Sequence, residues 1–319
     1  MQNGTMAVFG CEIDERAMFE RRAADFNVGV LCVTEPLGRA NAGLIPPGGA
    51  VSVNHKAPVD ARLIHTLRDR GVSYLSSRSA GLDHIDGAEA KLAGILVRGV
   101  SYSPGSVAEY TIMLMLMAIR GACSILRRAG RQDFRLEDSR ARELSEMTVG
   151  VVGAGRIGGA VIDRLKGFGC PIIAYDPHPR ADAEYAELDE LLRRSDIVTL
   201  HLPLTASTRR IIDRARVKRM KRGAILINTA RGALIDASAL ADSLERGWLA
   251  SAALDVVEGE EGWFYNDCAS AGPPPFARLL ALPNVVITPH TAFYTRRALD
   301  DIVFNTLADY LKYKGGNPS

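Results

Sequence analysis

The 319-residue chain has few cysteines and few aromatic residues, and it has almost no excess of charge of either sign. The five cysteines are Cys11, Cys32, Cys123, Cys170 and Cys268. Their number is odd and no two of them form a Cys-x-x-Cys pair, which favours reduced thiols in a cytoplasmic protein over a disulfide framework. The same spacing argues against a structural metal site, so we expect no metal ligand set.

The chain also lacks a basic tract, a secretory signal and a clean membrane span. Its 39 basic and 37 acidic residues are spread along its length, and the net charge of +2 does not indicate a nucleic-acid partner. The start, MQNGTMAVFGCEIDE, has no basic segment followed by a long apolar run. Residues 107–126 are apolar, but Glu109 and Arg120 interrupt them, so we expect a buried core or interface helix rather than a membrane span.

What the chain does contain is a regular alternation of short β-branched runs with helical segments. The predicted strands cover residues 7–10, 28–33, 50–55, 72–77 and 95–100, then 148–153, 171–176, 196–203, 224–228, 251–256 and 284–290. This alternation predicts an α/β protein with two doubly wound parallel-sheet domains. A chain of 319 residues, 47% of them hydrophobic, is long enough to bury the cores of two such domains. We place one domain at residues 1–102, completed by a C-terminal helix within 293–319, and the other at 103–292.

A glycine pattern in the second domain predicts a dinucleotide site. In GVVGAGRIGGAV, the residues Gly153, Gly155 and Gly158 form a GxGxxG pattern between a strand and a helix. Glycines there permit a tight turn, close approach of a pyrophosphate and close helix packing. The next strand ends at Asp176, whose carboxylate would accept the ribose hydroxyls of NAD(H). His178 and Arg180 follow it, which leaves some NADP(H) tolerance open.

Several chemically active side chains follow strands of the second domain, at the edge where doubly wound sheets bind ligands. They are Asp176, His201, Arg231, Asp255 and His290. Reduction of a 2-oxo acid needs a cation for the substrate carboxylate and a proton donor for the developing alkoxide, and Arg231 and His290 have those chemistries. A carboxylate beside His290 would favour its protonated form. Glu258, Glu260 and Glu261 all qualify by position, and an acidic surface loop is the alternative.

The chain resembles the D-2-hydroxyacid dehydrogenase family over nearly its whole length. The motifs are GAGRIG, HLPLTASTRRII, INTARGALID, ALDVVEGEE and TPHTAFYT, in that order. The resemblance implies a Rossmann nucleotide domain and a flavodoxin-like substrate domain with the active site in the cleft between them. It also implies that the apolar helix at 104–128 forms a homodimer interface.

The resemblance assigns roles residue by residue. It makes Arg231 the carboxylate-binding arginine, Glu260 the partner of the histidine and His290 the acid/base. Further cofactor contacts fall on Gly153, Gly155, Arg156, Ile157, Gly158, Asp176, His201, Thr229, Ala230 and Asp255, the last holding the nicotinamide amide. Substrate contacts fall on the backbone of Ser79, Ala80 and Gly81, on Arg231, and on Tyr102 and Phe293, which would close on a small side chain.

VRGVSYSPGSVAEY and TPHTAFYT are similar to the D-lactate dehydrogenase branch, and EGEEGWFYNDC to the D-lactate dehydrogenases of vancomycin-type resistance clusters. We therefore expect reduction of pyruvate to D-lactate for a D-Ala-D-Lac ligase. Two departures are Asp176, where such enzymes can have serine and arginine, and Glu261, where the family commonly has proline. The alternatives are a glyoxylate or hydroxypyruvate reductase and a non-catalytic NAD(H)-sensing protein.

Overall fold

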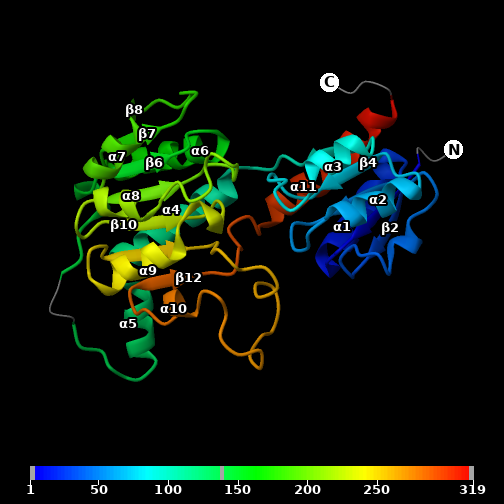
Figure 1. Cartoon of the computed structure of the whole chain (residues 1–319). Helices are drawn as coiled ribbons and strands as arrows, with labels where there is room; N and C mark the ends of the chain where they lie inside the picture. Colours follow the sequence, from blue (N-terminus) through cyan, green and yellow to red (C-terminus); the bar gives the residue numbers. More distant parts are fainter. Residues whose placement is uncertain (1–3, 137–139, 316–319) are drawn as a thin grey trace. The chain divides into compact units, whose positions relative to one another are not determined.

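The computed structural model describes residues 4–136 and 140–315. The outermost residues of the predicted first domain, 1–3 and 316–319, lie outside the described part. The chain divides into two compact units (Figure 1): unit 1 holds the residues up to Ser103 and those from Tyr294 onward, and unit 2 holds Pro104–Phe293.

Unit 1 is built on a five-stranded, wholly parallel sheet. Its strands are β1 (Thr5–Phe9), β2 (Gly29–Val33), β3 (Ala50–Val53), β4 (Tyr74–Ser77) and β5 (Leu96–Gly99). They lie in the order β2-β1-β3-β4-β5. This is the flavodoxin-like order that the resemblance predicts, with its switch point between β1 and β3.

Helices cover both faces of this sheet, because the strands carry apolar side chains on each face. The helices are α1 (Ile13–Phe26), α2 (Ala61–Asp69), α3 (Gly87–Leu92) and α11 (Arg296–Lys314). Phe9 and Leu75 pack with α2 on one face, and Met6 and Val8 pack with α1 and α11 on the other. The predicted C-terminal helix therefore packs on the sheet of unit 1.

Unit 2 is built on a seven-stranded parallel sheet. Its strands are β6 (Val149–Val152), β7 (Ile172–Tyr175), β8 (Glu184–Tyr185), β9 (Ile197–Leu200), β10 (Ile225–Asn228), β11 (Ser251–Leu254) and β12 (Val285–Ile287). They lie in the order β12-β11-β10-β9-β6-β7-β8. Counted from β6, the first six strands have the Rossmann order 3-2-1-4-5-6, so the predicted fold class is confirmed. The two-residue strand β8 is absent from the prediction because it is too short to show a periodicity.

The helices of unit 2 also lie on both faces of its sheet. They are α4 (Gly105–Ile119), α5 (Ala122–Ala129), α6 (Arg156–Leu165), α7 (Leu188–Arg194), α8 (Arg214–Arg219), α9 (Ala237–Glu245) and α10 (Ala277–Leu280). One apolar cluster joins α4 and α6 to the sheet. The opposite cluster joins α7, α8, α9 and α10 to it. The loops described below follow the carboxyl ends of these strands.

The single helix predicted at 104–128 is wrong, because it is two helices bent by 67°. Gly121 lies between them with a φ of 59°, a left-handed conformation in which glycine commonly ends a helix. Leu114 and Met115 of α4 are fully buried. Within residues 4–136 and 140–315 no single helix is long and apolar enough to span a membrane, and α4 with α5 meets that criterion only as a bent pair.

Candidate active site

The glycine-rich turn connects β6 to the N-terminus of α6. Gly153 has a φ of 92°, and a Cβ there would lie 2.8 Å from the backbone carbonyl carbon of His201. A Cβ on Gly158 would lie 1.8 Å from the carbonyl oxygen of Gly153. The start of α6 therefore packs against the turn with no room for a side chain at Gly158. Gly155 faces open space instead. The turn therefore keeps a cradle above the first N–H groups of α6, the geometry that accepts a pyrophosphate.

Asp176 lies at the end of β7 and is tied to this turn. Its Oδ2 accepts a hydrogen bond of 2.7 Å from the backbone N–H of Ala154, and its Oδ1 accepts one of 2.8 Å from that of His178. A carboxylate has further acceptor sites beyond these two bonds. The arrangement fixes an acceptor beside the glycine-rich turn, where the ribose of a dinucleotide would lie.

His201 follows β9 and lies against the same turn through its backbone. Its Nε2 is 3.0 Å from the hydroxyl of Thr199, and its Nδ1 is shut off from solvent with no hydrogen-bond partner among the described residues. Burial lowers the pKa of His201 to about 3. The neutral ring is unsuited to donate a proton near pH 7, so we assign His201 no proton transfer.

Arg231 is presented by a turn that Asn228, the last residue of β10, holds in place. The buried Asn228 amide donates 2.9 Å to the carbonyl of Arg231, and its oxygen accepts 3.0 Å from the N–H of Ala230. Arg231 Nη1 in turn donates to the Ala230 carbonyl at 2.7 Å. The turn also buries Thr229, whose hydroxyl is 2.9 Å from that of Thr111 on α4. The guanidinium of Arg231 is thus fixed at the carboxyl end of β10 in the unit 2 sheet.

His290 and Glu260 form a hydrogen-bonded pair at the end of β12. Glu260 Oε1 lies 2.8 Å from His290 Nδ1, and both side chains are largely buried, at 18% and 15% exposure. The other carboxylate oxygen of Glu260 accepts a 2.7 Å bond from the N–H of Val257. Glu258 pairs instead with Arg210. The fold therefore brings Glu260, rather than Glu258, to the histidine.

Asp255 organises the turn that carries His290. Its carboxylate accepts bonds from the Thr288 hydroxyl at 2.6 Å and from the N–H groups of Thr291 and Ala292 at 3.0 and 2.9 Å. Its own carbonyl accepts 2.8 Å from the N–H of His290. Burial raises the pKa of the Asp255 carboxyl above its ordinary value, and these hydrogen bonds oppose that rise. The residue predicted to hold the nicotinamide amide thus also holds the His290 turn.

Two aromatic rings flank the imidazole of His290. Phe293 meets it edge to face, with the ring centroids 6.2 Å apart, and Tyr265 meets it at a tilt of 33° and 6.3 Å. The Tyr265 hydroxyl also donates a 2.7 Å hydrogen bond to the His290 backbone carbonyl. Phe293 was among the predicted substrate residues, whereas Tyr265 was not. Tyr265 lies in a long loop, and the only sequence feature that could have indicated its role is the aromatic run WFY at 263–265.

The remaining predicted substrate residues belong to unit 1. Ser79, Ala80 and Gly81 follow β4, and the Ser79 carbonyl accepts a 3.1 Å bond from the N–H of Val100, next to β5. Tyr102 lies near the end of the unit, half-buried. These residues share the carboxyl-end edge of the unit 1 sheet.

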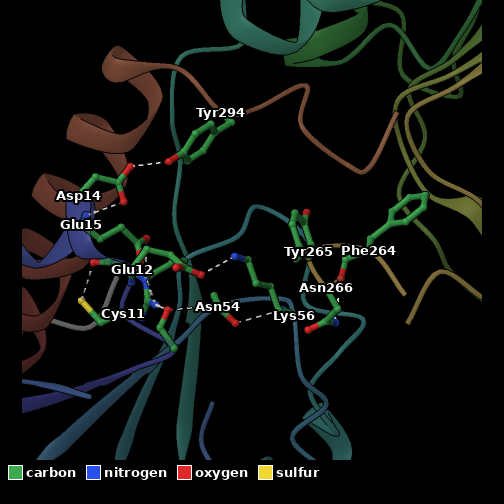
Figure 2. Close-up of polar contacts among 12 residues, drawn as sticks. Cys11, Glu12, Asp14, Glu15, Asn54, Lys56, Phe264, Tyr265, Asn266 and Tyr294 are labelled. Atoms are coloured by element: carbon green, nitrogen blue, oxygen red, sulfur yellow. Dashed lines mark hydrogen bonds and ion pairs between the residues drawn. The ribbon is translucent and has the colours of Figure 1, made fainter. Parts of the chain in front are cut away.

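Polar side chains connect two other loops at that edge of unit 1 (Figure 2). Lys56 forms an ion pair of 2.6 Å with Glu12. Its backbone N–H donates to Asn54, which donates in turn to the Gly10 carbonyl at 2.9 Å. The loops after β1 and β3 are therefore fixed to each other.

Cys11 and Cys32 are neighbours in unit 1 although 21 positions separate them in the sequence. Both pack in the apolar cluster under α1 and α11, and a hydrogen bond joins their thiols. That bond raises the pKa of Cys11, as does burial, and lowers the pKa of Cys32. No group of three or more His, Cys, Asp and Glu side chains that could hold a metal ion occurs in the described part of the chain.

Comparison with known families places these loops in context. Residues 112–292 match the family described as D-isomer specific 2-hydroxyacid dehydrogenase, NAD binding domain. A D-specific alpha-keto acid dehydrogenase of Enterococcus faecalis is 48% identical over 311 residues, which is 97% of this chain and 96% of the relative. An aromatic 2-oxoacid reductase of Clostridium sporogenes is 37% identical over 309 residues, which is 94% of this chain and 93% of the relative.

A solved structure agrees with these sequence matches. The D-lactate dehydrogenase of Aquifex aeolicus, complexed with NAD and lactic acid, superposes with a TM-score of 0.87 and 31% identity. The match covers 98% of this chain and 96% of that one. The cradle at Gly155 and the acceptor at Asp176 fit NAD(H). NAD is named in the description of the matched family domain, and the Aquifex aeolicus structure is complexed with NAD.

Proposed function

Because this chain belongs to the D-isomer-specific 2-hydroxyacid dehydrogenase family, we propose that it reduces a small 2-oxo acid, pyruvate above all, to the D-2-hydroxy acid. It is an oxidoreductase that uses NAD(H). The observation that carries the proposal is the His290–Glu260 pair, 2.8 Å apart, at the same strand-end edge of unit 2 as Arg231 and the glycine-rich turn.

In the proposed mechanism His290 moves the proton. Bound NADH supplies a hydride to the keto carbon. Glu260, anchored by the Val257 N–H, orients the imidazole through Nδ1, so that Nε2 is placed to protonate the developing alkoxide.

Arg231 is the proposed carboxylate clamp. A guanidinium meets a carboxylate with two parallel hydrogen bonds, which fixes the orientation of the substrate as well as its charge. The backbone N–H groups of Ser79, Ala80 and Gly81 are the further proposed contacts of the substrate carboxylate. The proposed cofactor contacts are Gly153, Gly155, Arg156, Ile157, Gly158, Asp176, His201, Thr229, Ala230 and Asp255.

We propose a small substrate side chain because Phe293 meets His290 edge to face and so limits the space beside the acid/base. Tyr102 is the proposed partner of Phe293 in closing on a methyl group. The relative that reduces aromatic 2-oxo acids makes larger substrates the second candidate. Glyoxylate and hydroxypyruvate are further alternatives.

The proposed physiological role is supply of D-lactate to a D-Ala-D-Lac ligase in glycopeptide resistance. It is supported by the similarity to the Enterococcus enzyme. We also propose a cytoplasmic homodimer in which α4 and α5 form the interface. The exposed Ile125 and Leu126 of α5, at 47% and 66% exposure, support that interface.

Asp176 makes NADH the proposed preferred cofactor, because its carboxylate would repel the 2′-phosphate of NADPH. Asp176→Ser should shift the ratio of kcat/KM for NADPH over NADH upward by about tenfold or more, which is about 1.4 kcal/mol. The two cofactors are compared with pyruvate held saturating. An unchanged ratio would remove Asp176 from cofactor selection.

NADH oxidation by the purified protein with pyruvate, 2-oxobutyrate, phenylpyruvate, glyoxylate and hydroxypyruvate tests the proposed function. Chiral analysis of the product follows, and His290→Ala is the control, with turnover expected to fall by about 10² to 10⁴ and NADH affinity kept. D-lactate from pyruvate as the best substrate supports the proposal. Tight NADH binding with no turnover of any 2-oxo acid would instead support an NAD(H)-sensing protein.

A further inference from the structure

We propose that Tyr265 is a positioning residue for His290, and that its hydroxyl holds the backbone turn which aims the imidazole. The inference rests on the proposed acid/base role of His290. Its basis is the 2.7 Å hydrogen bond from the Tyr265 hydroxyl to the His290 carbonyl. Tyr265 touches neither reacting atom in this role and acts through His290 alone.

The hydrogen bond joins two residues in a disfavoured backbone conformation. Tyr265 has a φ of 67° and His290 a φ of 53°. A left-handed conformation is disfavoured for a residue with a side chain, because its Cβ approaches the following carbonyl oxygen. Such conformations persist where surrounding contacts fix them, and they are frequent at active sites. In the described part of the chain only three other non-glycine residues have a positive φ.

Tyr265 is itself held in place by Phe264, the residue that precedes it. Phe264 packs edge to face on Phe276, with ring centroids 5.5 Å apart, and it belongs to the apolar layer on one face of the sheet. Its N–H donates to the carbonyl of Glu260. The side chains of Phe264 and Tyr265 point in different directions (Figure 2). The loop that supplies Glu260 is therefore anchored one residue before it supplies Tyr265.

This arrangement gives His290 three fixed points. Its N–H donates to the Asp255 carbonyl, its ring Nδ1 bonds to Glu260, and its carbonyl accepts from Tyr265. Without the third point the peptide after His290 can rotate toward the favoured right-handed region, and Nε2 then turns away from the substrate oxygen. Proton transfer depends on alignment within hydrogen-bond reach, so the loss should slow the proton-transfer step rather than weaken substrate binding.

The test is Tyr265→Phe, which removes one oxygen and keeps the ring beside His290. We expect kcat to fall about 3- to 10-fold, the effect of one lost neutral hydrogen bond, with KM for pyruvate changed less than twofold. The solvent deuterium isotope effect on kcat should rise, because proton transfer becomes more limiting. The matched control is Tyr313→Phe, which removes a 2.8 Å hydroxyl bond to Ser73 in unit 1 and should change none of these values.

A readout independent of turnover follows the His290–Glu260 bond itself. In ¹⁵N-histidine-labelled protein, the Nδ1–H proton of His290 is assigned by its absence in His290→Ala. It should exchange faster with solvent in Tyr265→Phe than in the wild type or in Tyr313→Phe.

Two results would overturn the inference. One is a Tyr265→Phe variant with wild-type kcat, isotope effect and Nδ1–H exchange. The other is a proportional loss of kcat and melting temperature with an unchanged isotope effect, which would mean that the hydroxyl only stabilises the loop. Failure of the proposed function gives a different pattern, namely a wild-type protein that turns over no 2-oxo acid, and the exchange measurement still tests the position of His290 in that case.

Discussion

At the scale of single residues, Arg231 has a position that its sequence neighbours explain. Asn228 uses both halves of its amide to close the turn after β10, so Arg231 leaves the strand in one defined direction. A short polar residue at the end of a buried strand commonly makes such a turn. The positive charge of Arg231 is therefore held at the ligand-binding edge of the sheet.

Arg231→Lys tests whether substrate binding needs only the positive charge or also the paired donors of the planar guanidinium. Lysine keeps the charge but loses the planar pair of donors, so we expect KM for pyruvate to rise about tenfold or more. Steady-state kinetics against pyruvate at saturating NADH measure it. Arg278→Lys, at an exposed ion pair with Glu245, is the control and should leave KM unchanged. An unchanged KM in Arg231→Lys would contradict the clamp.

His201 predicts a pH dependence of stability. Burial lowers its folded-state pKa to about 3, below the value of about 6.5 for an unfolded imidazole. The unfolded chain therefore binds more protons below pH about 6.5, and the free energy of unfolding decreases as the pH falls from there toward 3. His201→Gln, which can keep a bond to Thr199, removes this effect.

Urea unfolding at pH 6.5 and 5.5 measures that difference. The wild type should lose about 1 kcal/mol more than His201→Gln over this interval, since one proton changes stability by about 1.4 kcal/mol per pH unit. Equal losses in the two proteins would mean that His201 can be protonated without unfolding.

At the scale of elements, the turns at the strand ends decide function more than the strands do. The β6–α6 turn needs Gly158 for packing and Gly155 for access, and the two glycines have different surroundings. The turn after β12 is held by Asp255, so the element that carries His290 is organised from the neighbouring strand β11.

Substitution of the two glycines by alanine should separate packing from binding. Gly158→Ala places a methyl group on the Gly153 carbonyl and should lower both the melting temperature and NADH affinity. Gly155→Ala places it in open space, so the fold should be kept while NADH Kd rises about tenfold or more. Thermal unfolding and NADH fluorescence titration measure the two effects. Equal NADH affinity in Gly155→Ala and the wild type would contradict the cradle.

At the scale of the whole molecule, each unit has its own sheet and its own pair of apolar layers. In unit 1 the guanidinium of Arg78 is buried, at 1% exposure. It bonds to Glu15, to Ser52 and to the carbonyls of Phe9 and Gly10. A buried charge with so many partners fixes the loops at the end of that sheet.

Arg78→Ala should therefore destabilise unit 1 selectively. Removal of one partner of a buried ion pair costs about 3–5 kcal/mol, because Glu15 is left without its counter-ion. Calorimetry should show an early transition for unit 1 and a second one that NADH still raises. Arg278→Ala, at an exposed pair, should cost no more than about 1 kcal/mol. A single unshifted transition in Arg78→Ala would contradict this account.

Several features could be predicted from the sequence because local rules govern them. The β-branched runs predicted eleven of the twelve strands in residues 4–136 and 140–315, within a few residues at their ends. The GxGxxG pattern identified the nucleotide turn, because Gly153 and Gly158 leave no room for a side chain and Gly155 leaves the cradle open. Gly121 carried a helix-end signal as well, but the apolar run around it dominated the prediction of one long helix.

Other features were decided only by the tertiary structure, because they depend on contacts between distant segments. Three glutamates at 258, 260 and 261 are equivalent by spacing, and the loop around them turns Glu260 toward His290 and Glu258 toward Arg210. Cys11 meets Cys32 because β1 and β2 are neighbours in the sheet. Tyr265 reaches the carbonyl of a residue 25 positions away. Sequence patterns determine which side chains occupy the strand ends, whereas the packing of loops between strands selects which of those side chains meet.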